Sequence, residues 1–283
     1  MKNLKSISLV LGGGGARGLA HIGVLKVLKE YNIPISSIFG CSMGGLVASL
    51  FAIGTDIDEI VNIARKYTSV REMIQLVDIT PHRRGIIVSQ RLRGFFSQFI
   101  DESLQIEQTK IPLFMNAVDL VTGDEVVFDK GNLLDAIIST TAVPGLFSPV
   151  EKPKGFLLAD GGVINNLPIS TMRKYTFSPI VAVDVHHSFP NPPSSSHKGL
   201  ISSNSVIPEF IHDFYRAEMI MVRKIMDIQL SENPADLLIR PAIDPDINMF
   251  LGFQRADELI LSGEKAALEN LDEIQNLIKN SIF

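Results

Sequence analysis

The 283-residue chain has one cysteine, Cys41, which excludes an internal disulfide and any zinc site built on several cysteines. An excess of basic charge is also missing. There are 26 Lys and Arg against 31 Asp and Glu, and the net charge of −5 argues against a nucleic-acid partner. The chain contains no H-E-x-x-H pattern and no dense acidic loop, so we expect neither a metal nor a cofactor.

Long apolar runs are lacking as well, although 46% of the residues are hydrophobic. The longest run, residues 46–53, falls short of the roughly 20 residues that a membrane-spanning helix needs. The apolar run at residues 7–11 is also shorter than the core of a signal peptide, about 7–15 residues. We therefore expect a cytoplasmic protein, with peripheral contact at a membrane left open. The basic residues between positions 82 and 93 are more typical of a solvated surface than of a headgroup-binding patch.

Strand-like and helix-like segments alternate along the first part of the chain. Residues 6–11 and 33–39 are short, β-rich apolar runs, whereas residues 16–30, 45–52 and 57–67 have helical patterns. This strand–helix–strand–helix order predicts an α/β fold with parallel strands.

The remainder of the chain continues the mixture of strands and helices. The expected strands are residues 111–120, 125–128, 155–158, 180–185 and 235–240, and the expected helices are residues 133–139, 206–230 and 254–278. The segment 187–205, rich in Pro, Ser and Asn, is interpreted as an exposed connection, with a flap over the site as the alternative. We expect one domain over residues 1–283, with a motif-bearing core at about 7–205 and a C-terminal strand and helices at 206–283.

The segment Gly40-Cys41-Ser42-Met43-Gly44 fits the G-x-S-x-G turn, which exposes a serine hydroxyl between a strand and a helix. Gly40 and Gly44 lack the Cβ atoms that would clash across so tight a bend. The N–H of Met43 would then point toward the site and could donate to an oxyanion. The motif predicts a nucleophilic Ser42.

A second glycine motif lies earlier in the chain. Gly13-x-Gly15-x-x-Gly18 satisfies the dinucleotide-binding pattern and stands between a strand and a helix. A dinucleotide site also needs an acidic residue at the end of the second strand, and here that place holds Gly40-Cys41-Ser42. The pattern therefore favours a row of N–H groups that stabilises a transition-state oxyanion.

The base is sought among the acids and histidines. Asp160 ends an apolar strand and is followed by Gly161 and Gly162, which permit a tight turn, although an Asp that only caps a turn is the simpler alternative. A triad of Ser42, Asp160 and His186 is conceivable. However, the α/β-hydrolase fold places its nucleophile after several strands, whereas here the glycine loop and the serine follow adjacent strands. We favour Asp160 as the base.

Taken in order, the three motifs resemble those of the patatin-like phospholipases over about residues 7–170, and residues 139–147 look like the segment before their aspartate turn. The resemblance implies a three-layer α/β/α fold with a mainly parallel central sheet and a catalytic dyad of Ser42 and Asp160. It also implies an oxyanion hole, formed by Gly13, Gly14 and Gly15 with Arg17 beside it and the Met43 N–H. The remaining motif glycines are Gly18, Gly40, Gly44, Gly161 and Gly162.

The expected activity is that of a serine acyl hydrolase of the lipase, phospholipase A or lysophospholipase type, acting on a lipid or ester substrate through an acyl-enzyme. Acyl transfer to a lipid acceptor on the same site is an alternative. A nucleotide-binding module that uses the glycine loop, or a lipid-binding protein without turnover, are alternatives outside the enzyme class. The oligomeric state is left open.

Overall fold

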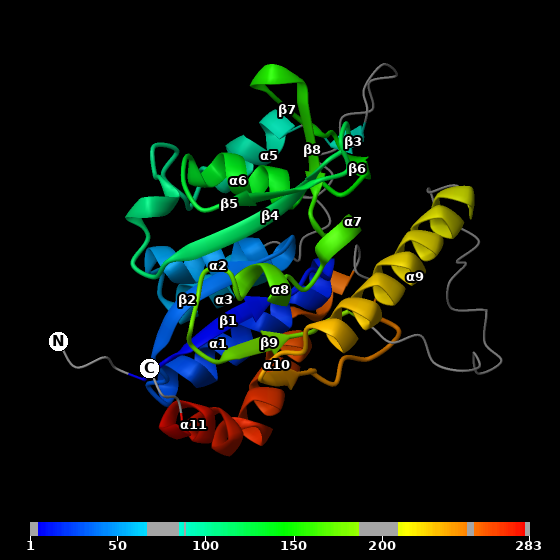
Figure 1. Cartoon of the computed structure of the whole chain (residues 1–283). Coiled ribbons are helices and arrows are strands. Elements are labelled where there is room, and N and C mark those ends of the chain that lie inside the picture. Colours follow the sequence, from blue (N-terminus) through cyan, green and yellow to red (C-terminus); the bar gives the residue numbers. More distant parts are fainter. Residues whose placement is uncertain (1–4, 67–84, 88, 187–208, 248–251, 281–283) are drawn as a thin grey trace.

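The structure is a computed structural model that describes residues 5–66, 85–87, 89–186, 209–247 and 252–280. Figure 1 shows strands and helices packed as layers around a central sheet. The strands are β1 (Ile7–Leu11), β2 (Ile35–Gly40), β3 (Gly85–Ile87), β4 (Leu113–Asp119), β5 (Glu125–Phe128), β6 (Gly145–Phe147), β7 (Val150–Lys152), β8 (Phe156–Asp160), β9 (Ile180–Val183) and β10 (Leu237–Ile239). The α-helices are α1 (Ala20–Glu30), α2 (Met43–Ile53), α3 (Ile57–Lys66), α5 (Ser89–Phe96), α6 (Leu133–Thr140), α7 (Gly162–Asn165), α8 (Ile169–Met172), α9 (Glu209–Glu232), α10 (Ala256–Glu269) and α11 (Leu271–Asn280). Short 3₁₀ helices lie at Gly15–Leu19, Ile106–Gln108, Pro153–Gly155 and Gly252–Arg255.

The central sheet has the strand order β10-β9-β1-β2-β4-β8-β7, and β5 pairs with β4 outside this path. The strands from β10 to β4 are parallel to one another, whereas β5, β8 and β7 are added in antiparallel pairs. The expected mainly parallel α/β sheet is therefore confirmed. The expected strands at 111–120 and 125–128 correspond to β4 and β5, which pair as an antiparallel hairpin.

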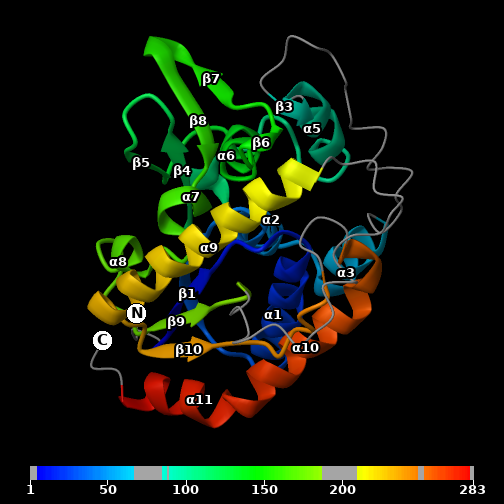
Figure 2. The same ribbon diagram turned by 90° about the vertical axis from the view of Figure 1, so that its right-hand side faces the viewer.

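Helices cover both faces of the sheet, so its central strands are buried on both sides. Along β1, Leu9 packs into one cluster with residues of α1, α2 and α10, and the next residue, Val10, packs into a second cluster with Met172 of α8 and Met226 of α9. Figure 2 shows α8 and α9 on one side of β1 and β9, with α1 and α10 on the other. The three-layer arrangement implied by the resemblance is thus confirmed.

The order of strands brings the ends of β2 and β8 to the same level of the sheet. Gly40 at the end of β2 pairs with Met115 of β4, so the next residues of β4 extend beyond β2. Asp160, the last residue of β8, pairs with Ala117 in that extension. The antiparallel direction of β8 therefore delivers Asp160 beside the turn that follows β2.

The end of the chain differs from expectation. Residues 254–278 were predicted as one helix, and this is wrong, because α10 ends at Glu269 and α11 begins at Leu271. The break falls at Asn270, whose side-chain Nδ2 donates to the carbonyl of Ala266 at 2.8 Å. A side-chain amide that satisfies a carbonyl of the last turn competes with helix continuation. The predicted helix at 16–30 likewise begins as the 3₁₀ turn Gly15–Leu19 before α1.

Helices α1 and α10 touch backbone to backbone. A Cβ atom on Gly263 would overlap the carbonyl oxygen of Ala20, and one on Gly23 would overlap the carbonyl oxygen of Ile260. Two glycines thus allow α10 to lie directly against the helix that follows the glycine loop.

We predict that Gly263→Ala lowers the free energy of unfolding by about 1–3 kcal/mol, because the methyl group forces the two backbones apart. The helical propensity of alanine acts in the opposite direction. Gly94→Ala in α5 is the matched control, since an added Cβ there meets nothing within 4 Å, and it should raise stability by up to about 1 kcal/mol. Urea denaturation of both variants tests the close contact, and equal effects at the two sites would contradict it.

Candidate active site

Ser42 occupies the turn between β2 and α2, and its backbone is strained. Its φ of 54° and ψ of −126° lie in a region that side chains rarely adopt, at a cost of order 1–3 kcal/mol. The N–H of Ser42 donates to the hydroxyl of Thr140 at 2.9 Å, which helps to hold the turn. At Gly44 the turn comes so close to β1 that a Cβ would overlap the carbonyl oxygen of Leu11. The conformation is the one that the G-x-S-x-G pattern predicts.

The glycine loop after β1 lies beside this turn. A Cβ on Gly13 would lie only 3.1 Å from the Cβ of Ser42. The N–H of Gly13 donates to the carbonyl of Asn166 at 3.1 Å, so Gly13 would have to release this bond before it could bind an oxyanion. Gly14 and Gly15 follow at the start of the 3₁₀ turn, and Gly15 has a φ of 54°. The predicted oxyanion loop and the predicted nucleophile are thus brought together.

His21 supports the glycine loop from α1. Its Nε2 lies 2.7 Å from the carbonyl oxygen of Gly12. Burial lowers the pKa of His21 to about 4, so the ring is neutral at physiological pH and Nε2 carries the proton that it donates. His21 therefore supports the backbone of the glycine loop.

The Arg17 side chain binds the C-terminal part of the chain, because its Nε donates to the carbonyl of Ile247 at 3.0 Å. Burial lowers the pKa of Arg17.

Asp160 meets Ser42 from the end of β8. The residue is 4% exposed, its Oδ1 accepts from the N–H of Gly162 at 2.8 Å, and the Ser42 side chain lies close enough to its carboxyl to lower its pKa. Burial raises the pKa of Asp160 to about 6, although hydrogen bonds from Ser42, Gly162 and Cys41 act in the opposite direction. The structure thus pairs the predicted nucleophile with a carboxylate whose proton affinity is well above that of an ordinary aspartate.

Cys41 precedes Ser42 but offers different chemistry. Its side chain is fully buried, and its Sγ lies 3.8 Å from Oδ1 of Asp160. Burial raises the pKa of the Cys41 thiol, and the nearby negative charge of Asp160 adds to the increase. The sulfur therefore remains a neutral thiol at physiological pH and is a poor nucleophile there.

Asn166 is a contributor that sequence reasoning missed. Its side-chain Nδ2 donates to the carbonyl of Gly13 at 3.2 Å, while its own carbonyl accepts from the Gly13 N–H. A Cβ on Gly162 would lie 2.7 Å from the Asn166 Oδ1. One side chain thus joins the glycine loop to the turn after Asp160. The only signal in the sequence is an amide residue four positions beyond the Asp-Gly-Gly turn.

Glu125 organises the same turn from the β4–β5 hairpin and was also missed. Its Oε1 accepts from Nδ2 of Asn116 at 2.9 Å and of Asn165 at 2.8 Å, and its Oε2 accepts from the Thr171 hydroxyl at 2.8 Å. Asn116 also donates to the carbonyl of Asn165 and packs so closely on Gly161 that a Cβ there would overlap its amide. The network fixes the backbone on both sides of the aspartate turn.

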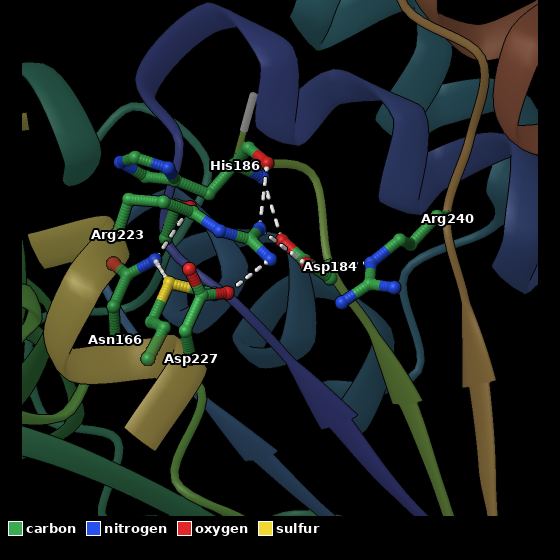
Figure 3. Close-up of polar contacts among 8 residues, drawn as sticks. Asn166, Asp184, His186, Arg223, Asp227 and Arg240 are labelled. Atoms are coloured by element: carbon green, nitrogen blue, oxygen red, sulfur yellow. Dashed lines mark hydrogen bonds and ion pairs between the residues drawn. The ribbon is translucent and has the colours of Figure 1, made fainter. Parts of the chain in front are cut away.

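A third group of polar contacts attaches α9 above β9 (Figure 3). Oδ2 of the buried Asp184 accepts from Nη1 of Arg223 and from Nε of Arg240, each at 3.0 Å. Arg223 also binds Asp227, one turn further along α9, at 2.6 Å. Losing one partner of such a buried pair typically costs about 3–5 kcal/mol. Asp184 therefore anchors α9 to the end of β9.

Two features considered in the sequence lie outside the described residues, the basic side chains at 82–84 and the segment 187–205. Arg93, from the same basic stretch, forms an ion pair with Asp135. Within the described part of the chain, no cluster of three or more His, Cys, Asp or Glu could hold a metal ion. No helix in that part combines the length and apolar character needed to cross a membrane.

Comparisons with known proteins identify the family to which this chain is similar. A family model described as patatin-like phospholipase matches residues 9–173. An uncharacterized NTE family protein of Mycobacterium tuberculosis is 28% identical over 97% of this chain, and lysophospholipase NTE1 of Pyricularia oryzae is 28% identical over 96% of it. The chain spans about half of the first relative, 48%, and 19% of the second.

Solved structures show the same fold. Human GIVD cytosolic phospholipase A2 has a TM-score of 0.53 at 10% identity, and the match covers 98% of this chain and 60% of that one. At so low an identity the likeness concerns the path of the backbone.

The raised pKa of Asp160 predicts a pH-dependent effect of Asp160→Asn on stability. Between pH 3.8 and about 6 the unfolded chain ionises this carboxyl while the folded protein keeps it protonated, so stability is lost as pH rises through that window. The asparagine variant escapes this loss. Its stability relative to the wild type should increase by roughly 2 kcal/mol between pH 4.5 and pH 7.5, measured by urea denaturation.

Asp119→Asn is the control for this measurement. A hydrogen bond from the Leu157 N–H holds the pKa of Asp119 below its ordinary value, so Asp119 is ionised at both pH values. The difference between Asp119→Asn and the wild type should therefore be the same at pH 4.5 and pH 7.5. A parallel trend for both variants would contradict the burial effect at Asp160.

Proposed function

The chain belongs to the patatin-like phospholipase family, and from this membership we propose that it is a serine acyl hydrolase that cleaves carboxylic ester bonds of lipids. One observation carries the proposal. A serine in a strained strand-to-helix turn lies beside a buried aspartate, whose pKa its side chain lowers, and beside a glycine loop. We assign Ser42 as the nucleophile and Asp160 as the general base.

In the proposed first step, Oγ of Ser42 attacks the ester carbonyl carbon and its proton passes to Asp160. The negative oxygen of the tetrahedral intermediate is stabilised by N–H groups of Met43, Gly14 and Gly15, each worth roughly 3–4 kcal/mol in measured cases. The bond to the alcohol then breaks, and the leaving oxygen takes the proton from Asp160. Gly13 joins these donors if its bond to Asn166 opens.

In the second step, water attacks the acyl-enzyme. Asp160 accepts one proton from the water, the acyl–oxygen bond to Ser42 breaks, and Oγ recovers that proton as the fatty acid leaves. The base ends each cycle as the carboxylate with which it began.

Burial makes Asp160 a stronger base than an ordinary aspartate. An ordinary aspartate has a pKa near 3.9, well below that of histidine near 6.5. Because burial raises the pKa of Asp160 to about 6, most of this difference disappears. Asp160 is then largely ionised at neutral pH and still binds a proton strongly enough to act as a base.

For the substrate we propose phospholipids or lysophospholipids. One relative that matches 96% of this chain carries the name lysophospholipase. The family name points to the same class of lipid.

We further propose that the protein meets a membrane through α9. Phe214, Met221 and Ile228 are each 57–58% exposed and follow one another at seven-residue intervals, so they form a stripe on one side of the helix. The opposite side of α9 carries Met226, which contacts Asn166 beneath it. A lipid surface that covers the stripe would bring ester substrates beside the site.

Ser42→Ala and Asp160→Asn should each reduce ester hydrolysis at least about a thousandfold, with circular dichroism unchanged, because one removes the attacking oxygen and the other the base. A fluorophosphonate should label the wild-type protein at Ser42 in a peptide map. Cys41→Ala should keep both the label and most of the activity, since the buried thiol takes no part.

His186→Gln separates the dyad from a triad. Activity within about tenfold of the wild type supports Asp160 as the base. If His186→Gln lost activity while Asp160→Asn kept it, the triad would replace the dyad. If folded, active protein failed to react with the fluorophosphonate, the serine hydrolase assignment would be wrong.

The membrane contact predicts that Met221→Ser combined with Ile228→Ser weakens binding to phosphatidylcholine vesicles by about tenfold or more, since two apolar side chains no longer leave water. Leu261→Ser with Leu268→Ser is the matched control, because these residues are also seven apart and 47% exposed, but lie on α10. Vesicle flotation measures both pairs. An equal loss for the two pairs would argue against α9 as the contact.

A further inference from the structure

A second carboxyl group faces the site from α9. Glu218 is half-buried, and its Oε2 is enclosed without a hydrogen-bond partner among the described residues. Helix α9 packs on α7, which begins at Gly162, two residues after Asp160. Glu218 therefore belongs to the helix that packs on the short helix after the proposed base, and Figure 2 shows α9 running past α7.

The helical spacing places Glu218 on the inner side of α9. Val222, Met226 and Gln229 follow it at four, eight and eleven positions, which is one face of an α-helix. Val222 and Met226 are buried, and Nε2 of Gln229 donates to the carbonyl of Ile164 in α7 at 2.9 Å. Met226 lies against Asn166, whose amide also binds the glycine loop. The face that bears Glu218 is thus the face turned to the site.

Asp160 is the charged residue that acts on the pKa of Glu218. Burial raises the pKa of Glu218 to about 7, and the negative charge of Asp160 adds to the increase. Among the side chains that the structure describes, the other charges on α9 and α7 are placed elsewhere: α7 has no titratable side chain, Arg223 binds Asp184 and Asp227, and Arg216 and Lys224 are exposed. Glu218 is accordingly neutral in slightly acidic solution and negative in slightly alkaline solution.

We propose that Glu218 is a specificity-determining residue, which admits lipids with an anionic phosphodiester beside the scissile ester when its carboxyl is protonated and disfavours them when it is ionised. The inference rests on the proposed function. An ester carbonyl that reaches Ser42 and Asp160 brings its neighbouring headgroup under α9, where a carboxylate would repel a phosphodiester. A neutral ester has no charge for Glu218 to repel.

The test compares two substrates across pH 5.5–8.5, short-chain phosphatidylglycerol, which is anionic throughout, and the diacylglycerol with the same acyl chains. The quantity measured is the ratio of their kcat/KM values, in which the ionisation of Asp160 cancels. In the wild type the ratio for anionic over neutral ester should fall roughly tenfold with a midpoint near pH 7, the effect of two unit charges about 10 Å apart. In Glu218→Gln the ratio should stay flat.

Two controls complete the experiment. Glu218→Asp keeps the charge and should keep the fall, and Glu232→Gln makes the same change of charge about 21 Å further along α9 and should behave as the wild type. A flat ratio in the wild type, or a fall that persists in Glu218→Gln, overturns the inference while hydrolysis of both esters leaves the proposed function standing. If neither ester is hydrolysed, the proposed function itself is overturned, and the inference with it.

Discussion

The site depends on keeping one carboxyl group out of water. Asp160 loses hydration on folding, and its carboxyl in the described structure accepts from an N–H and a thiol and is influenced by the Ser42 hydroxyl, all of them neutral groups. Neutral donors stabilise a carboxylate less than a cation would, so its proton affinity stays high. Placing a cation beside Asp160 would stabilise the fold and lower the proton affinity of the proposed base. The protein instead keeps its buried arginine, Arg223, on Asp184 at another strand end.

The surrounding network holds this unfavourable group in position. Glu125 collects three side-chain donors around the turn after Asp160, and Asn166 joins that turn to the glycine loop. Thr140 binds the backbone of the strained Ser42. The groups that hold the site thus come from segments far apart in the sequence, and each contributes hydrogen bonds that no single segment could make alone.

Local features of the site could be predicted from the sequence, and long-range ones could not. The strained turn at Ser42 follows from five consecutive residues, because the glycines on both sides of the serine lack the Cβ atoms that would clash in so tight a bend. The meeting of Ser42 with Asp160 was indicated by the aspartate turn and the family resemblance and not by local geometry, since it depends on β8 running antiparallel to β4. Glu218 has no motif at all, and its position becomes meaningful only once α9 is seen to cross α7. The catalytic roles of Ser42 and Asp160 stay predictions.

Because β1 lies inside the sheet, the chain cannot be cut at the end of the family match without exposing it. The family match ends at residue 173, yet β1 lies between β2 and β9, and β9 begins only at Ile180. Helix α10, further still along the chain, packs on α1 directly behind the glycine loop. A fragment that stopped where the match stops would turn β1 into an uncovered edge strand, with the apolar sequence Ile-Ser-Leu-Val-Leu open to pairing with other molecules. The recognisable motifs and the autonomous folding unit therefore have different boundaries, and a segment identified by similarity alone would be expected to aggregate.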